Sequence, residues 1–222
     1  MKGHKINSFN KVIITLSTVF VVSSCSLLGI QNEESPDYKI LIKDGSFEIR
    51  QYSSYVVAET TIAGDFDNAS GSAFRILAGY IFGKNKGDKK IAMTSPVEME
   101  QQSSKIAMTS PVEMQQQGNR FTMRFTMRFS MPSQYTLEDL PEPLDTRITF
   151  NVIQPELRAS YQYSWLSSKT KSFKKSQALR EWLKLHSDYQ ASDVYFYAGY
   201  NPPWTLPFLR RNEVHIVLSS NN

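Results

Sequence analysis

An eleven-residue run with strict alternation constrains the fold of this chain most. In residues 121–131, Phe and Met occupy every odd position, while Thr, Arg and Ser occupy every even position. Successive side chains of a strand point to opposite faces of its sheet. The run therefore predicts a strand with an apolar face in the core and a polar face in solvent.

The middle of the chain contains two tandem copies. The sequence KIAMTSPVEM at residues 90–99 returns unchanged at 105–114, and FTMR occurs twice at 121–128. The four-residue copy preserves the in/out phase of a strand because four is even, whereas the 15-residue copy reverses that phase. We expect one KIAMTSPV copy to keep a place in the sheet while the other loops out, or the two copies to form a hairpin across residues 100–104. Pro96 should end ladder pairing or lie on an edge.

Two amphipathic helices are predicted among several strands. The first ends at Gly83, is capped by Asp67 or Asn68, and has an apolar stripe; the second covers residues 173–185. Leu179, Trp182, Leu183 and His186 lie along one side of the second helix. The remaining strand-type runs are residues 38–43, 47–52, 55–62, 147–153, 157–166, 193–200 and 213–218, with a turn at Asp44-Gly45 between the first two.

The order strand, strand, helix occurs twice, at residues 47–82 and at about 148–185. Leu77 and Ile81 of the first unit match Leu179 and Leu183 of the second at an offset of 102 residues. Two such halves, each burying one helix face on an antiparallel sheet, predict an α+β, barrel-like domain with pseudo-twofold symmetry.

The amino terminus has the features of an export signal. Residues 1–11 contain three Lys and no acid, and residues 12–22 are almost wholly apolar. At 1.5 Å per residue, this apolar run spans about half of a hydrocarbon core of roughly 30 Å, which indicates a signal peptide rather than a membrane helix. The single Cys, Cys25, follows Val22-Ser23-Ser24, a pattern that resembles the lipobox of bacterial lipoproteins. We therefore predict lipidation of Cys25; the alternative is a buried or free thiol.

This interpretation divides the chain into a signal peptide at residues 1–24, a lipidated tether at 25–37 and one domain at 38–218. Ser26, in place of Asp after the cysteine, favours the outer membrane, facing the periplasm. Without residues 1–24 the chain keeps 22 of its 25 basic residues against 21 acidic ones. This balance gives no support for a nucleic-acid partner. The expected partners are a membrane, through the lipid anchor, and a small molecule.

Motifs in a fixed order show a family resemblance. They are FEIRQY at 47–52, AFRIL at 73–77, YIFGKN at 80–85, KIAMTSPV at 90–97, MPS at 131–133, YTLE at 135–138, AGYNPPWTLP at 198–207 and RRNEV at 210–214. With these motifs the chain resembles the SOUL/heme-binding protein family over residues 38–218. The resemblance implies a distorted antiparallel β-barrel of about eight strands with two flanking helices and affinity for heme or another tetrapyrrole.

The resemblance also implies a ligand site beside the first helix, where the matching residues are Phe74, Leu77, Ala78 and Ile81. A porphyrin is a flat apolar disc that needs aromatic and aliphatic walls, with a few cations at its propionate edge. Arg210 and Arg211 are the nearest candidates for those cations, and either could instead form a structural ion pair.

No residue is assigned as an iron ligand or a metal ligand. His186 is expected to interact with a helix dipole, and His215 to be a surface residue or a satisfied core residue. Alternation and copying explain the methionines at 93–131 without a metal.

Nothing in the sequence argues for an enzyme. It contains no Ser or Cys nucleophile with a recognisable His partner, no HExxH and no Gly-rich phosphate loop. A non-catalytic tetrapyrrole binder is therefore expected. Two alternatives remain, a structural or interaction lipoprotein without a ligand and a binder of other apolar small molecules.

Overall fold

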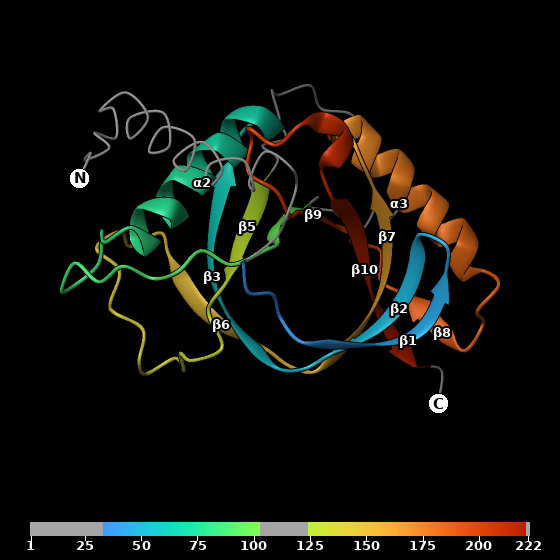
Figure 1. The fold of residues 1–222 in the computed structure, drawn as a ribbon, viewed down its shortest axis with the longest axis horizontal. Coiled ribbons are helices and arrows are strands. Elements are labelled where there is room, and N and C mark those ends of the chain that lie inside the picture. The colour runs from blue at the N-terminus through green and yellow to red at the C-terminus, as the bar shows by residue number, and fades with distance from the viewer. Residues whose placement is uncertain (1–32, 103–123, 221–222) are drawn as a thin grey trace, which may run out of the picture.

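The computed structural model describes residues 33–102 and 124–220, which form one curled antiparallel sheet with two helices against its outer face (Figure 1). The described elements are β1 (Tyr38–Asp44), β2 (Phe47–Tyr52), β3 (Tyr55–Ala63), α2 (Phe66–Ile81), β4 (Val97–Gln102), β5 (Arg124–Ser130), β6 (Thr149–Ile153), β7 (Glu156–Tyr163), α3 (Lys169–Leu183), β8 (Tyr189–Ala191), β9 (Phe196–Gly199), the 3₁₀ turn η1 (Pro207–Leu209) and β10 (Asn212–Ser220). The α+β class is confirmed, as an open half-barrel of ten described strands.

The strand order shows two interlocked halves. It runs β1-β2-β7-β10-β9-β4-β5-β3-β6, with β8 added to β10. In the first half β2, β3 and α2 follow one another, and in the second half β6, β7 and α3 do. β2 of the first half pairs with β7 of the second half. In the same way, β6 of the second half pairs with β3 of the first half. The predicted pseudo-twofold relation is thus present in the hydrogen bonding, and β4 and β9 pair across the axis.

Each helix covers its own half of the sheet. Under α2, Leu77 and Ile81 are buried against apolar residues of β3, β4 and β5. Under α3, Leu179 and Leu183 are buried against β2, β7 and β10. These four residues are the ones that the offset of 102 relates, so both helices use the same register toward the sheet.

The helix starts differ from the prediction. The side chain of Asp65, rather than Asp67 or Asn68, caps α2 by accepting a hydrogen bond from the Asn68 amide at 3.1 Å. The helix begins early because Phe66 already packs on the core. Similarly, α3 is capped by Ser168 and begins at Lys169, four residues before the predicted start, since the lysine-rich first turn shows no apolar periodicity. Gly83, at a φ of +111°, follows the end of α2 as expected.

The alternating run gives β5, and half of its prediction is wrong. Phe125, Met127 and Phe129 are buried under α2, as expected. The opposite face is not in solvent: Thr126 and Ser130 are buried, and Arg128 donates to Glu59 at 2.8 Å. The reason is the curl of the sheet, which turns this second face toward the inside of the half-barrel.

The first KIAMTSPV copy places only its end in the sheet. Residues 90–96 are irregular, and β4 begins at Val97, directly after Pro96, between β9 and β5. Pro96 therefore lies outside the ladder, as expected. The second copy, at 105–114, lies outside the described residues, so the choice between a loop and a hairpin stays a prediction.

The expected signal peptide and Cys25 also lie outside the described residues. The last part of the expected tether, residues 33–37, contacts the domain: the Glu34 carbonyl accepts from the Ser95 amide at 2.8 Å, and its carboxylate accepts from the Ser133 amide at 2.7 Å. Among the helices of residues 33–102 and 124–220, none is long and apolar enough to cross a membrane.

Candidate functional site

The predicted stripe on α2 faces the sheet rather than an open groove. Leu77 and Ile81 have at most 1% of their surface exposed, and Ala78 has 9%. Phe74 is the exception, with 36% exposed and its ring edge-on to Phe129 at 5.6 Å between centroids. A ligand lying on α2 would therefore meet Phe74 first.

The two predicted arginines lie in the loop between β9 and β10. Arg210 donates from Nε to the carbonyl of Thr205 at 2.9 Å and also binds the carbonyl of Pro203, so it holds this loop closed. Arg211 donates from Nε to Glu213 at 2.8 Å, and its guanidinium lies 4.0 Å from the centre of the Tyr200 ring. The predicted ligand residues thus form two groups, one on α2 and one in this loop.

A charged network fills the concave face of the sheet. Arg50 of β2 donates to Glu48 at 2.7 Å and, with two nitrogens, to Glu213 of β10 at 2.7 and 3.1 Å. Arg158 of β7 donates to Glu98 of β4 and, at 2.7 Å, to the Tyr55 hydroxyl of β3. The network thereby joins strands from both halves.

The electrostatics of this network favour the ionised forms. Burial raises the pKa of Glu98, but Arg158 and His215 outweigh it and lower that pKa to about 2. Burial likewise acts against the charge of Glu213, and His215 and Arg50 overcome it, so the pKa of Glu213 is lowered well below its usual value. These carboxylates therefore stay charged at neutral pH and serve as partners for buried arginines.

Sequence reasoning missed this network. The signal that could have found it is the alternation of polar residues within β2, β7 and β10. Only the curl of the sheet turns the polar face of these strands inward.

His215, expected to be a surface or satisfied core residue, is fully buried, and its Nε2 lies 2.6 Å from Glu213 Oε2. It faces Ser160 across the β7–β10 ladder, so a serine, a histidine and a carboxylate lie close together. Both Ser160 and His215 have 0% exposed surface, which leaves a substrate no access to them. The ring of His186 packs on Trp182, 4.5 Å between centroids, just beyond α3.

Two cavities flank the helices. The α2 cavity, about 310 Å³, is lined by Ser72, Arg75, Ile76, Tyr80, Lys84, Asp145, Arg147 and Ile148. The α3 cavity, about 520 Å³, is lined by Gln101, Lys169, Thr170, Phe173, Ser176, Gln177, Arg180, Asp193, Val194 and Tyr195. At the offset of 102 residues, Phe74 and Ala78 correspond to Ser176 and Arg180. The α3 cavity thus opens where α2 has Phe74.

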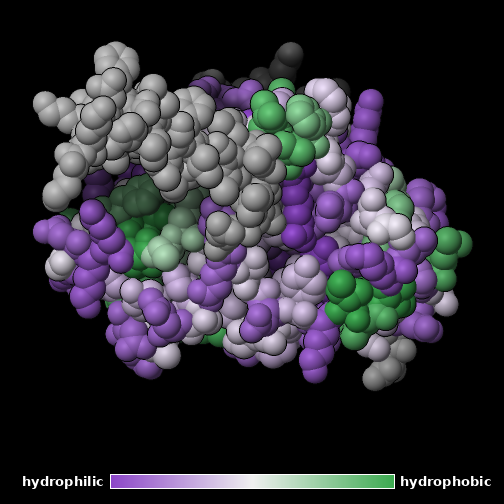
Figure 2. Space-filling model, viewed as in Figure 1, coloured by the Kyte–Doolittle hydropathy of each residue, from purple (hydrophilic) through white to green (hydrophobic). Residues whose placement is uncertain are grey.

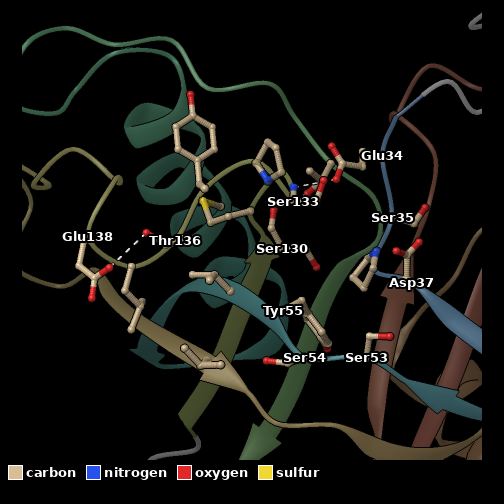
Figure 3. Close-up of a pocket in the computed structure, with 18 residues that line it drawn as sticks. Glu34, Ser35, Asp37, Ser53, Ser54, Tyr55, Ser130, Ser133, Thr136 and Glu138 are labelled. Carbon is tan, nitrogen blue, oxygen red and sulfur yellow. Dashed lines mark hydrogen bonds between the residues drawn. The ribbon is translucent and has the colours of Figure 1, made fainter.

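A third cavity, about 380 Å³, lies between the start of the domain and the loop after β5 (Figure 3). We call it the acidic cavity. It is lined by Glu34, Ser35, Pro36, Asp37, Ser53, Ser54, Tyr55, Val56, Thr94, Ser130, Met131, Pro132, Ser133, Tyr135, Thr136, Leu137, Glu138 and Val152. In Figure 3, Glu34 and Asp37 lie on one side of it and Glu138 on the opposite side.

Apolar and basic residues lie at the surface beside α2. In Figure 2, apolar side chains line a hollow on the α2 side of the molecule, and hydrophilic residues lie to its left. The cations Arg75, Lys84 and Arg147 of the α2 cavity lie beside the same helix. Sequence reasoning did not select them, because isolated basic residues carry no periodic signal. Within residues 33–102 and 124–220, no group of three His, Cys, Asp or Glu side chains is placed to hold a metal ion.

Comparison with known proteins gives a consistent family. A family model described as SOUL heme-binding protein matches residues 33–217. Heme-binding protein 1 of Xenopus laevis is 29% identical over 199 residues, which covers 89% of this chain and 97% of that protein. Heme-binding protein 2 of Homo sapiens is 31% identical over 175 residues, 78% of each chain.

Solved structures share the fold at low identity. The C-terminal domain of EcmrR superposes with a TM-score of 0.53 at 8% identity, covering 82% of this chain and 98% of that one. An uncharacterized conserved protein from Listeria innocua gives a TM-score of 0.53 at 11% identity, covering 78% of this chain and 92% of the other. At these identities the likeness shows the fold alone.

Proposed function

Because the chain belongs to the SOUL heme-binding protein family, we propose that it binds heme or a related tetrapyrrole beside α2, without catalysing a reaction, while tethered to a membrane. Heme binding is supported at the level of the family. The position on α2, the absence of catalysis and the tether are parts of the proposal.

The exposure of Phe74 is the observation that supports placing the tetrapyrrole on α2. It presents an aromatic ring to solvent on a helix whose other apolar residues are buried or partly buried. Arg75 follows it in α2, and Arg75 and Lys84 line the α2 cavity, where Arg147 is already paired with Asp145. An apolar surface bordered by cations matches a flat apolar ligand with two propionates.

The acidic cavity fits heme poorly. Three carboxylates and no Lys, Arg or His line it, so the propionates of heme would meet charges of their own sign. The burial of Ser160 and His215 supports a non-catalytic protein, since the one Ser–His–Glu arrangement described above has no exposed surface.

The membrane tether rests on the sequence around Cys25. Two acyl chains or more on that thiol would anchor the protein stably, on the periplasmic side of the outer membrane as Ser26 favours. The described contacts of Glu34 with Ser95 and Ser133 would then hold the domain close to its anchor.

Hemin titration of two matched variants tests the function and its position. Phe74→Asp puts a carboxylate on α2, and Phe173→Asp does the same on α3, where Phe173 is 51% exposed beside the larger cavity. Wild-type protein should show a saturable Soret shift. Phe74→Asp should weaken hemin binding by at least about tenfold, because it places a charge against an apolar ligand and near its propionates.

Phe173→Asp should leave hemin binding unchanged. Weakening by Phe173→Asp alone would move the site to α3. The absence of a saturable shift in the wild type would reject heme as the ligand and favour a structural lipoprotein.

A further inference from the structure

The acidic cavity is built for a ligand of the opposite charge to heme. We propose that it binds an organic cation with an apolar body, at a site separate from the tetrapyrrole site on α2. The walls of the cavity, its charges and one hydroxyl in its lining support this assignment.

The walls combine apolar and hydroxyl groups. Val56, Met131, Leu137 and Val152 supply aliphatic and thioether surface, and Tyr55 and Tyr135 supply aromatic rings. Leu137 is 41% exposed and Val152 is 37% exposed, so apolar surface remains open to a ligand. The volume of about 380 Å³ falls within the range of roughly 300–1,000 Å³ that is usual for small-molecule sites.

The charges around this surface have one sign. Glu34, Asp37 and Glu138 line the cavity, and no Lys, Arg or His does. Arg158 lies behind Tyr55, but it is bound to Glu98 and Glu156 and is itself buried. The field inside the cavity is therefore negative, and carboxylates on opposite sides of it (Figure 3) attract a cation over its whole width.

The aromatic rings add a second attraction. A quaternary or aromatic cation over the face of Tyr55 or Tyr135 gains a cation–π interaction, which is stronger where water is displaced. An anion of the same shape would lose this interaction and meet three like charges. Charge selectivity is thus the property that the cavity predicts.

The hydroxyl of Ser130 offers a polar contact inside the cavity. Ser130 is only 5% exposed and lines the cavity. Its carbonyl accepts a hydrogen bond from Thr94, but its hydroxyl makes no hydrogen bond among the described residues. A ligand with a hydrogen-bonding group could therefore use this hydroxyl as a donor or an acceptor.

A pair of ions with one shape and opposite charges tests the proposal. Tetraphenylphosphonium and tetraphenylborate are titrated separately into the purified full chain by calorimetry. The phosphonium should bind saturably, at least about tenfold more tightly than the borate, and its affinity should fall as ionic strength rises.

Two double variants locate the site. Asp37→Asn with Glu138→Gln should weaken phosphonium binding by at least about fivefold while leaving hemin binding unchanged. The matched control, Glu181→Gln with Asp188→Asn, removes two exposed carboxylates elsewhere and should change neither. Equal or stronger borate binding, an unchanged phosphonium affinity in the first variant, or displacement of the phosphonium by hemin would each overturn the proposal.

Discussion

At the scale of single residues, the interior of the half-barrel depends on charge pairing rather than on apolar packing. Arg50 and Arg158 are each about 1% exposed, and both have carboxylate partners on other strands. Taking two charges out of water costs several kcal/mol per ion, so each pair is stabilising only as long as both partners remain charged. Protonation of Glu98 should therefore lower the free energy of unfolding.

Acid should destabilise the protein through Glu98. Its pKa falls from 4.5 in the unfolded chain to about 2 in the fold, and at about 1.4 kcal/mol per pH unit this shift corresponds to about 3 kcal/mol. Because the folded pKa is the lower one, this stability is fully present above about pH 4.5 and is lost as the pH falls toward 2. Urea unfolding at pH 7, 5, 4 and 3 should show the decline.

Glu98→Gln should lower the free energy of unfolding at pH 7 and flatten the decline below pH 4.5. Glu181→Gln, which removes an exposed partner of Lys184, is the control and should keep the wild-type pH profile. An unchanged profile in Glu98→Gln would show that other carboxylates govern the acid transition.

At the scale of elements, β4 shows how a duplicated segment can join a sheet without disturbing it. The strand takes the end of the first KIAMTSPV copy and the residues after it, and it pairs with β9 and β5 over Val97–Gln102. Deleting residues 100–114 would join Met99 to Gln115 and change this strand from VEMEQQ to VEMQQQ. Only Glu100, which lies 3.4 Å from Arg128, changes in chemical type.

The deletion should be neutral or stabilising. The connection between β4 and β5 shortens from residues 103–123 to residues 118–123, which lowers the entropy cost of closing the loop by about 1 kcal/mol. Chemical denaturation should therefore show an unfolding free energy equal to that of the full chain or about 1 kcal/mol higher. Glu100→Gln in the full chain separates the lost ion pair from the loop effect. A loss well beyond that of Glu100→Gln would show that the second copy contributes to the core.

At the scale of the whole molecule, the two halves complete each other. β2 and β6 pair with strands of the opposite half, and β4 pairs with β9 across the pseudo-twofold axis. The charged interior also crosses this boundary, since Arg50 binds Glu213, 163 residues later. Neither half therefore forms a complete sheet by itself.

Separated halves should not fold. Fragments covering residues 25–146 and 147–222 each leave strand edges and buried charges without partners, so circular dichroism and amide NMR should show no cooperative structure in either one. Mixing the two fragments should restore the dispersed spectrum of the intact chain. A cooperative thermal transition in one fragment alone would contradict this interdependence.

Local patterns in the sequence were sufficient for most of the elements and for the symmetry, but they did not predict the three-residue strand β8. The Asp44-Gly45 turn, the alternation of Phe125, Met127 and Phe129, and the offset that relates Leu77 to Leu179 all depend on residues close in sequence or on a repeated period. They identified the hairpin, β5, both helices and the two halves, because each of these features is encoded in a local pattern or in its repetition. The family resemblance came from the same short motifs.

The tertiary structure determined whether each face of those elements lies in the core, in the charged interior or at the surface. Alternation in β5 gave two faces, but only the curl of the sheet made the polar face an interior lined by arginines and glutamates. The stripe on α2 was correctly found as apolar, yet packing against β3 and β5 left only Phe74 at the surface. The acidic cavity joins residues 34–37 to the loop after β5, about a hundred residues apart, as in the contact of Glu34 with Ser133. Curvature and long-range contact are properties of the assembled sheet, so no local period in the chain could encode them.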